Sequence, residues 1–156
     1  MVDYKIIQIA LSKPHKRYKV MMEKVREIAH DYELITEWVP RHKKFYDSIP
    51  PESHYHWLRS DVIRFEYLSE HENVLYLDWD VNIKYLPNVN SLTWTMYYDY
   101  WAIFNGYETS VFDSILEKGI EMKRKVQAKS IGRNWLMDEI KNVGGGVFDK
   151  ECMCHG

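Results

Sequence analysis

The chain has 156 residues, 46% hydrophobic and 28% charged, a composition typical of a single globular domain that spans residues 1–156. Its 21 basic and 23 acidic residues leave a net charge of −2, which excludes a strongly basic nucleic-acid-binding protein. No segment offers the roughly 18 to 20 consecutive apolar residues that a membrane-spanning helix needs. The opening residues also lack the pattern of a secretory leader, so we expect a cytoplasmic protein.

Strand-like and helix-like patterns alternate at the start of the chain. Residues 4–11 form a short apolar run before a Ser-Lys-Pro turn, which predicts a buried strand. Apolar residues then recur every three or four positions over 15–32, which predicts an amphipathic helix. A second strand is predicted over 34–39, where Pro40 ends it. A strand, a helix and a strand with short connections indicate the opening of a parallel α/β sheet.

The middle of the chain predicts a helix and a strand that ends in two acidic residues. Residues 53–69 carry apolar side chains at helical spacing, and residues 74–77 form a short apolar strand that stops at Asp78-Trp79-Asp80. Strict alternation over 94–104 predicts a further strand. The remaining predicted elements are a strand over 81–85, a helix that begins at Thr109 or Ser110, and a helix within 130–141.

Asp78 and Asp80 are the first candidates for chemistry. They follow a buried strand, and open α/β sheets bind their ligands beyond the carboxyl ends of the strands. Carboxylates are hard oxygen ligands that suit Mg²⁺ or Mn²⁺, and such an ion could neutralise a diphosphate. The plain alternative is a solvated turn that contains two incidental acids.

Asp61 and Arg64 are the second pair of candidates. They are three residues apart on the predicted helix and therefore share a face. Asp61 can accept hydrogen bonds from sugar hydroxyls, and Arg64 offers a fork of donors to hydroxyl or phosphate oxygens. The plain alternative is an ion pair within the helix, which contributes little to stability.

These residues stand in a recognisable order. Ser60-Asp61-x-x-Arg64 and Leu68 are followed, after a short link, by Leu75-Tyr76-Leu77-Asp78-Trp79-Asp80-Val81. This order resembles the sugar-binding region of DXD-containing glycosyltransferases, a group with capsular-polysaccharide transferases, yeast-type initiating mannosyltransferases and clostridial glucosylating toxins. The run from Tyr4 to Ile9 is also similar to their first strand, although it lacks their His. Their usual Gly-Gly before the DXD strand is Glu72-Asn73 here.

The resemblance implies both a fold and an activity. The fold is a small GT-A-like, Rossmann-like α/β/α sandwich with a mostly parallel central sheet. The activity is that of a metal-dependent hexosyltransferase that moves a sugar from a nucleoside diphosphate sugar, with a UDP-sugar as the favoured donor. The implied cofactor is Mn²⁺ or Mg²⁺, and the implied outcome is retention of the anomeric configuration. The acceptor, whether glycan, protein or small molecule, is not identified by the sequence.

The resemblance also implies roles for individual residues. Asp78 and Asp80 would be the catalytic pair, with Asp80 as a direct metal ligand and Asp78 on the ribose or on a metal-bound water. The remaining implied contacts are with the donor sugar, from Ser60, Asp61 and Arg64, and with the nucleotide, from Ile9, Ala10 and Asp78.

The C-terminal segment 152–156 contains both cysteines, Cys152 and Cys154, followed by His155. Cysteines this close cannot staple the fold, and with His155 they are too few for a complete zinc site. Many enzymes of the GT-A fold take a further metal ligand from a C-terminal His, and His155 is the candidate for it. Because the segment has little apolar content, we expect either a frayed end or a tail that is ordered only by a bound ligand.

Two other classes of protein compete with the glycosyltransferase. A non-catalytic module that binds a sugar nucleotide or a glycan would keep the same pocket, and the short chain leaves this alternative open. A HAD-type phosphotransferase also has an Asp-x-Asp strand end, but that class needs the motif near the start and a later strand that ends in two acids. The expected partners are a nucleotide sugar and an acceptor, with no nucleic acid, and a homo-oligomer is left open.

Overall fold

The computed structural model describes residues 3–89, 93–96, 102–106, 109–125 and 150–155. The helix predicted within 130–141 lies outside these ranges. None of the helices in the described ranges is long and apolar enough to cross a membrane.

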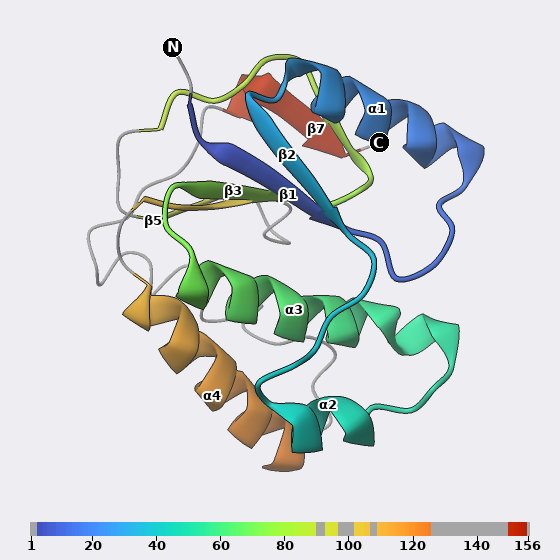
Figure 1. Cartoon of the computed structure of the whole chain (residues 1–156), viewed down its shortest axis with the longest axis vertical. Helices are drawn as coiled ribbons and strands as arrows, with labels where there is room; N and C mark the ends of the chain where they lie inside the picture. The colour runs from blue at the N-terminus through green and yellow to red at the C-terminus, as the bar shows by residue number, and fades with distance from the viewer. Residues whose placement is uncertain (1–2, 90–92, 97–101, 107–108, 126–149, 156) are drawn as a thin grey trace.

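A five-stranded sheet forms the centre of the molecule (Figure 1), and its strands lie in the order β2-β1-β3-β6-β5. The strands are β1 (Lys5–Ile9), β2 (Asp31–Ile35), β3 (Val74–Leu77), β5 (Thr93–Met96) and β6 (Ala102–Asn105). Strand β1 pairs in parallel with β2 and β3, and β6 is antiparallel to both β3 and β5. Strand β5 therefore runs in the same direction as the first three, and the sheet is mostly parallel, as predicted.

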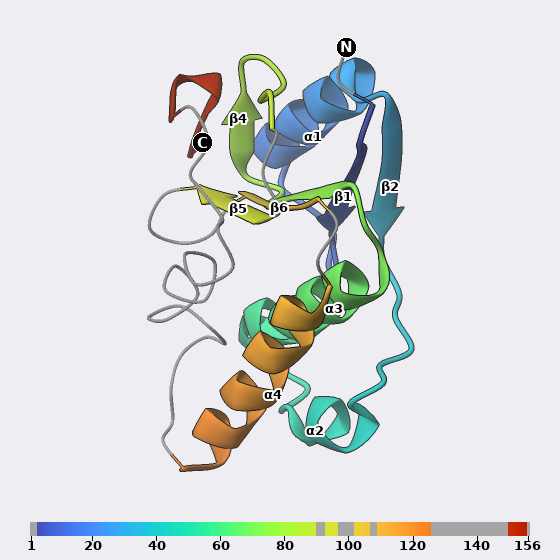
Figure 2. The same cartoon turned by 90° about the vertical axis from the view of Figure 1, so that its left-hand side faces the viewer.

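Helices cover both faces of this sheet (Figure 2). One face carries α1 (Lys16–Ile28) and a small antiparallel pair of strands, β4 (Val81–Ile83) and β7 (Met153–His155). The other face carries α2 (Lys43–Ser48), α3 (His56–Glu70) and α4 (Ser110–Lys125). Two short 3₁₀ turns precede α3 and β7, at Ser53–Tyr55 and Lys150–Cys152. The predicted α/β/α sandwich is confirmed.

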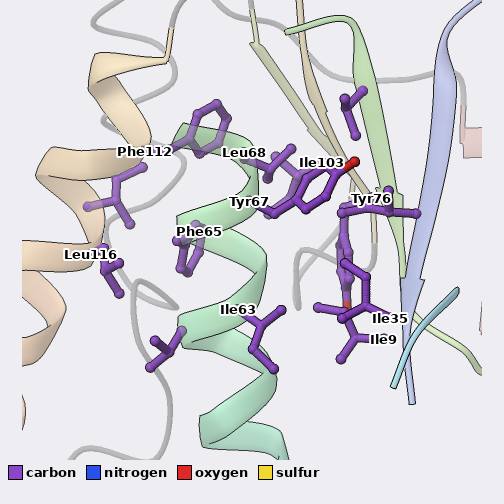
Figure 3. Close-up of a cluster of buried hydrophobic side chains, with 14 of the residues drawn as sticks. Ile9, Ile35, Ile63, Phe65, Tyr67, Leu68, Tyr76, Ile103, Phe112 and Leu116 are labelled. Carbon is purple, nitrogen blue, oxygen red and sulfur yellow. The ribbon is translucent and has the colours of Figure 1, made fainter. Parts of the chain in front are cut away.

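The sheet separates two hydrophobic clusters. Figure 3 shows Ile9, Ile35 and Tyr76 of the strands facing Ile63 and Tyr67 of α3, within the cluster that also packs against α4. The second cluster lies between the sheet and the α1 layer, and its members include Ile6, Leu75, Val81 and Met153. Successive residues of a strand point to opposite faces, so β1 contributes Ile6 to one cluster and Ile7 to the other. Burial on both faces explains why these strands read as continuous apolar runs.

The helix predicted over 15–32 is shorter than expected. It ends at Ile28, where Ala29 takes an extended conformation while its amide still donates to Val25. Strand β2 therefore begins at Asp31, three residues before the predicted start at 34. The polar residues of β2 interrupt the apolar pattern by which a buried strand is recognised in a sequence. Glu33 of β2 is stabilised by an ion pair with Lys5 of β1, whose Nζ lies 2.6 Å from Oε1 of Glu33.

The strand predicted over 94–104 is two strands. Segments 93–96 and 102–105 are β5 and β6, which pair antiparallel with Trp94 opposite Phe104. An alternating pattern continues through a hairpin as it does through one long strand, so alternation alone cannot separate the two. Residues 97–101 between them lie outside the described ranges.

Asn73, just before β3, stands where the resemblance leads one to expect glycine. Its φ is 56°, in the left-handed region that Gly tolerates best and that Asn adopts more readily than most residues. Its carbonyl accepts from the amide of Lys5 at 3.2 Å and its amide donates to Gly106 at 3.1 Å. The turn into β3 is thus preserved without glycine.

Candidate functional site

The carboxyl end of β3 leads into a tight turn that carries both acidic candidates. The amide of Val81 donates to the carbonyl of Asp78 at 3.4 Å, and β4 begins directly after Asp80. The neighbouring parallel strand β1 ends at Ile9 on the same edge of the sheet. The turn therefore lies at the carboxyl edge of the sheet, where open α/β folds bind their ligands.

A compact polar cluster connects this turn to α3. The hydroxyl of Tyr76 donates to Oδ1 of Asp78 at 2.5 Å and accepts from Nη2 of Arg64 at 2.9 Å. The guanidinium of Arg64 also approaches the same Asp78 oxygen at 3.4 Å and Oδ1 of Asp61 at 3.4 Å. It lies over the Tyr76 ring, 4.2 Å from the ring centroid. Helix α3 and strand β3 thus hold one buried charge network.

Solvent reaches this network mainly through Asp78. The side chains of Asp61 and Arg64 are 4% and 7% exposed, whereas that of Asp78 is 23% exposed. Arg64 is therefore held in one orientation by its neighbours, and Asp78 is the member of the network that a ligand can reach most easily.

Burial raises the pKa of Asp78 to about 6, although Arg64 and Tyr76 oppose the shift. The charges of Asp80 and Asp61 contribute to this rise, because three carboxylates share the neighbourhood of one guanidinium. Burial also raises the pKa of Tyr76 well above its usual value, so its hydroxyl remains a hydrogen-bond donor. The site has an excess of negative charge that a cation would offset.

An aromatic stack lies on the opposite side of the turn. The rings of Tyr18 in α1 and Trp79 have centroids 5.8 Å apart and an angle of 28° between their planes. The ring of His15 meets Tyr18 edge-on at 6.4 Å. Polar groups of the α3 layer and aromatic rings of the α1 layer therefore flank the same turn.

The structure brings together three of the residues predicted from the sequence, namely Asp61, Arg64 and Asp78. Asp80 follows in the same turn and acts on Asp78 through its charge. Ser60 is partly buried on α3, one residue before Asp61. Sequence reasoning did not select Tyr76 or Tyr18, and the apolar run that surrounds Tyr76 gave no sign of a polar role.

Ile9 and Ala10 offer little surface to a nucleotide. Their side chains are buried, and the amide of Ala10 donates to the carbonyl of Ile35 at 2.9 Å. Their implied contact with the nucleotide stays a prediction.

Residues 152–155 of the C-terminal segment are folded, so the expectation of a frayed end or of a tail that only a ligand would order is wrong. Strand β7 pairs with β4, with His155 opposite Val81, and the carbonyl of Cys152 accepts from the amide of Lys84 at 2.7 Å. The side chains of Cys152 and Met153 are 0% and 2% exposed. The low apolar content of the tail does not predict its order, because the tail is ordered by distant partners. These are β4 and the hydrophobic cluster between the sheet and α1, which we call the α1-side cluster.

Asp78 and Asp80 offer two carboxylates to a divalent ion, which would need water and a phosphate ligand to complete its shell. Within the described ranges, no group of three or more His, Cys, Asp or Glu side chains could hold a metal. Mg²⁺ is usually bound by one or two carboxylates and completes its shell with water and substrate phosphates. Asp78 and Asp80 match that pattern, and the backbone of His155 lies beside the next residue, Val81.

Two hollows in the described part of the chain lie away from this edge. One, of about 730 Å³, is lined by residues such as Lys5 and Val74, at the amino ends of β1 and β3. The other, of about 670 Å³, lies between α1 and β2 and is lined by Met22 and Tyr32 among others. Neither of these two hollows is lined by Asp61, Arg64 or Asp78.

No protein-family model matches the chain, and no curated protein matches its sequence. A solved structure does match: the crystal structure of a glycosyltransferase involved in the glycosylation of the major capsid of PBCV-1. The TM-score is 0.53 at 15% sequence identity, and the match covers 92% of this chain and 79% of that chain. At this identity the likeness establishes the fold alone: the chain has the α/β/α fold of a glycosyltransferase.

Proposed function

We propose that the protein is a glycosyltransferase that takes its sugar from a nucleoside diphosphate sugar, with a UDP-sugar as the favoured donor. The observation that carries the proposal is the buried cluster of Asp61, Arg64, Tyr76 and Asp78 at the carboxyl edge of the sheet. The fold that the chain shares with a glycosyltransferase supports it. The acceptor is left open.

Each part of the donor has a partner of suitable chemistry around the turn. Asp61 and Arg64 can bind sugar hydroxyls, since a carboxylate accepts and a guanidinium donates. Asp78 and Asp80 would hold Mn²⁺ or Mg²⁺, which when bound acts as a Lewis acid and neutralises the charge of the departing diphosphate. The rings of Tyr18 and Trp79 offer an aromatic surface to the nucleobase.

In the reaction, the bond between the anomeric carbon and the diphosphate oxygen breaks and a bond to an acceptor oxygen forms. The acceptor hydroxyl gives up its proton in that step to the departing diphosphate oxygen or to water. Arg64 and Asp61 are held rigidly by their neighbours and would orient the sugar for it. Retention of the anomeric configuration stays a prediction from the resemblance.

The proposal is tested by the thermal stability of the protein with UDP. A ligand that binds only the native state raises the melting temperature, so UDP should do so in the presence of Mn²⁺ or Mg²⁺ and not with EDTA. Asp80→Asn should abolish this shift, whereas Asp47→Asn, a control on α2 at an exposed pair with Lys43, should keep it. A full shift in Asp80→Asn protein with EDTA would overturn the proposed metal site.

Release of UDP distinguishes an enzyme from a binding module. The active enzyme should release UDP from a UDP-sugar in the presence of an acceptor or, slowly, of water. Binding of the UDP-sugar without any release would instead support the non-catalytic module. The HAD-type alternative predicts release of phosphate from a phosphate monoester, and that result would replace the present proposal.

A further inference from the structure

Gln8 is a polar residue at the centre of the sheet. It belongs to β1, between β2 and β3, and its side chain is 0% exposed. Oε1 of its amide accepts from the hydroxyl of Tyr32 at 2.7 Å, and Nε2 donates to the backbone carbonyl of Asp78 at 3.1 Å. A buried amide is costly unless its groups are hydrogen-bonded, and here both ends of the amide have a partner.

The carbonyl of Asp78 determines which way this amide faces. A carbonyl oxygen can only accept, so the NH₂ group of Gln8 must face it. A tyrosine hydroxyl can donate or accept and therefore adapts to whichever end of the amide remains. The hydrogen bond to Asp78 therefore fixes the orientation of the Gln8 amide, and the hydrogen bond from Tyr32 stabilises that orientation.

The hydrogen bond between Gln8 and Asp78 lies just beyond the last paired residues of β1 and β3. The pairing between β1 and β3 ends at Ile7 and Tyr76. Two residues later the backbone enters the turn, in which the carbonyl of Asp78 also accepts from the amide of Val81 at 3.4 Å. Gln8 therefore ties the first residue of the turn back to β1.

Asp78 is held from both faces of the sheet. On the α3 side Tyr76 and Arg64 hydrogen-bond to its carboxylate, and on the α1 side Gln8 hydrogen-bonds to its carbonyl. Fixing the backbone as well as the side chain of Asp78 also fixes the path to Asp80, two residues further along the turn.

We propose that Gln8 is a positioning residue that holds the Asp78–Asp80 turn so that both carboxylates meet the same metal–diphosphate group. This inference rests on the proposed function. Gln8 acts through the backbone of Asp78, because both ends of its amide are already bonded, to Tyr32 and to that backbone. Residues that orient metal ligands typically change metal affinity by about 10- to 100-fold when they are replaced.

Two variants separate this role from a general contribution to stability. Gln8→Met keeps the length of the side chain and removes both hydrogen bonds, whereas Tyr32→Phe removes only the bond at the far end of the amide. Both should lower the melting temperature. With UDP present, the dissociation constant of Mn²⁺ should rise by about tenfold or more in Gln8→Met and stay within about twofold of wild type in Tyr32→Phe. Equal weakening in both variants, or none in Gln8→Met, would overturn the inference.

A measurement without ligand separates this inference from the proposed function. The amide of Val81 closes the turn, so its hydrogen exchange should be faster in Gln8→Met than in Tyr32→Phe. If the wild-type protein binds no Mn²⁺–UDP, the proposed function is wrong, and the exchange rates still decide whether Gln8 holds the turn. Equal rates in the two variants would show that it does not.

Discussion

At the scale of single residues, the site depends on how Arg64 is shared. Its guanidinium has Asp61 and Asp78 within 3.4 Å, donates to the Tyr76 hydroxyl at 2.9 Å and covers the ring of Tyr76. A planar fork of donors can serve several partners in this way, whereas an ammonium group is a single point charge. Orientation, more than charge, is therefore what Arg64 contributes.

We expect Arg64→Lys to separate recognition of the sugar from recognition of the nucleotide. The charge beside Asp61 and Asp78 is kept, so neither carboxylate is left buried without a cation. The fork is lost, and the affinity for a UDP-sugar should fall by more than about tenfold while that for UDP changes by less than about threefold. Isothermal titration with both ligands in Mn²⁺ measures this difference, and equal losses would mean that Arg64 does not contact the sugar.

At the scale of elements, Glu66 joins α3 to the segment that follows β2. Its side chain is 0% exposed and accepts from Trp38 Nε1 at 2.8 Å and from the amides of Arg41 and His42 at 3.0 and 2.8 Å. Nδ1 of the His42 ring lies 2.6 Å from Oε2 of Glu66. Burial alone would raise the pKa of Glu66, but these hydrogen bonds outweigh it and lower the pKa.

Glu66 should therefore stabilise the fold in a pH-dependent manner. A carboxyl whose pKa is lowered by folding contributes stability above its unfolded pKa, near 4.5, and loses that contribution as the pH falls through the folded value. Glu66→Gln should cost about 1 to 3 kcal/mol at pH 7, and the difference should shrink below about pH 4.5. Urea unfolding between pH 3 and pH 7 measures it.

Glu70→Gln is the matched control for this prediction. Glu70 lies on the same helix in an exposed pair with Arg41, and exposed pairs contribute little, within about 1 kcal/mol. A pH-independent difference between wild type and Glu66→Gln would contradict the assignment of the lowered pKa.

The folded tail changes how His155 must be tested. Deletion of residues 152–156 would remove Cys152 and Met153 from the α1-side cluster and confuse folding with binding. His155→Ala leaves the backbone pairing of β7 intact. If His155 is a metal ligand, this variant should bind Mn²⁺–UDP more weakly than wild type at pH 7.5.

The pH dependence makes this test specific. A histidine ligates only when neutral, so the difference between wild type and His155→Ala should fade at pH 5.5, below the usual pKa of about 6.5. Cys154→Ala, at the adjacent exposed position opposite Asn82, should bind like wild type at both values. Identical affinities of His155→Ala and wild type at pH 7.5 would remove His155 from the metal shell.

The elements differ in how far the sequence could predict them, and the reason is physical. Strand β3 and the turn after it were predicted because a buried apolar run ends at two charges within a few residues. Strand β7 was missed because its order depends on pairing with β4, about 70 residues earlier in the sequence. The role of Gln8 was missed for the same reason, because its partners Tyr32 and Asp78 are 24 and 70 residues away. The role of Tyr76 depends on Arg64, which is 12 residues earlier and on a different element.

At the scale of the whole molecule, one sheet serves two hydrophobic clusters. Ile6 and Ile7 are neighbours in β1, and both are fully buried, yet they belong to the α1 side and the α3 side respectively. Neither layer can lose its packing without exposing the opposite face of the same strand. The fold class followed from the sequence because this two-sided burial leaves apolar strands between amphipathic helices.

We therefore expect the domain to unfold in a single cooperative transition. Ile6→Ala and Ile7→Ala should each cost about 2 to 5 kcal/mol and lower the midpoint of that one transition. Calorimetry, with circular dichroism in the near and far ultraviolet, measures this. Two separate transitions, each shifted by only one of the variants, would indicate two independently folding parts.

The position of the Asp78–Asp80 turn between two layers has a consequence for engineering. The polar contacts proposed for the sugar come from α3 and β3, whereas the ring surface proposed for the nucleobase comes from Trp79 and from Tyr18 of α1. Substitutions in separate layers without shared partners are expected to act additively. A library of variants randomised around Tyr18 should thus change the preferred base and leave the preferred sugar unchanged. A library randomised around Asp61 should change the preferred sugar and leave the preferred base unchanged. The specificity for the base and the specificity for the sugar could then be changed independently of each other.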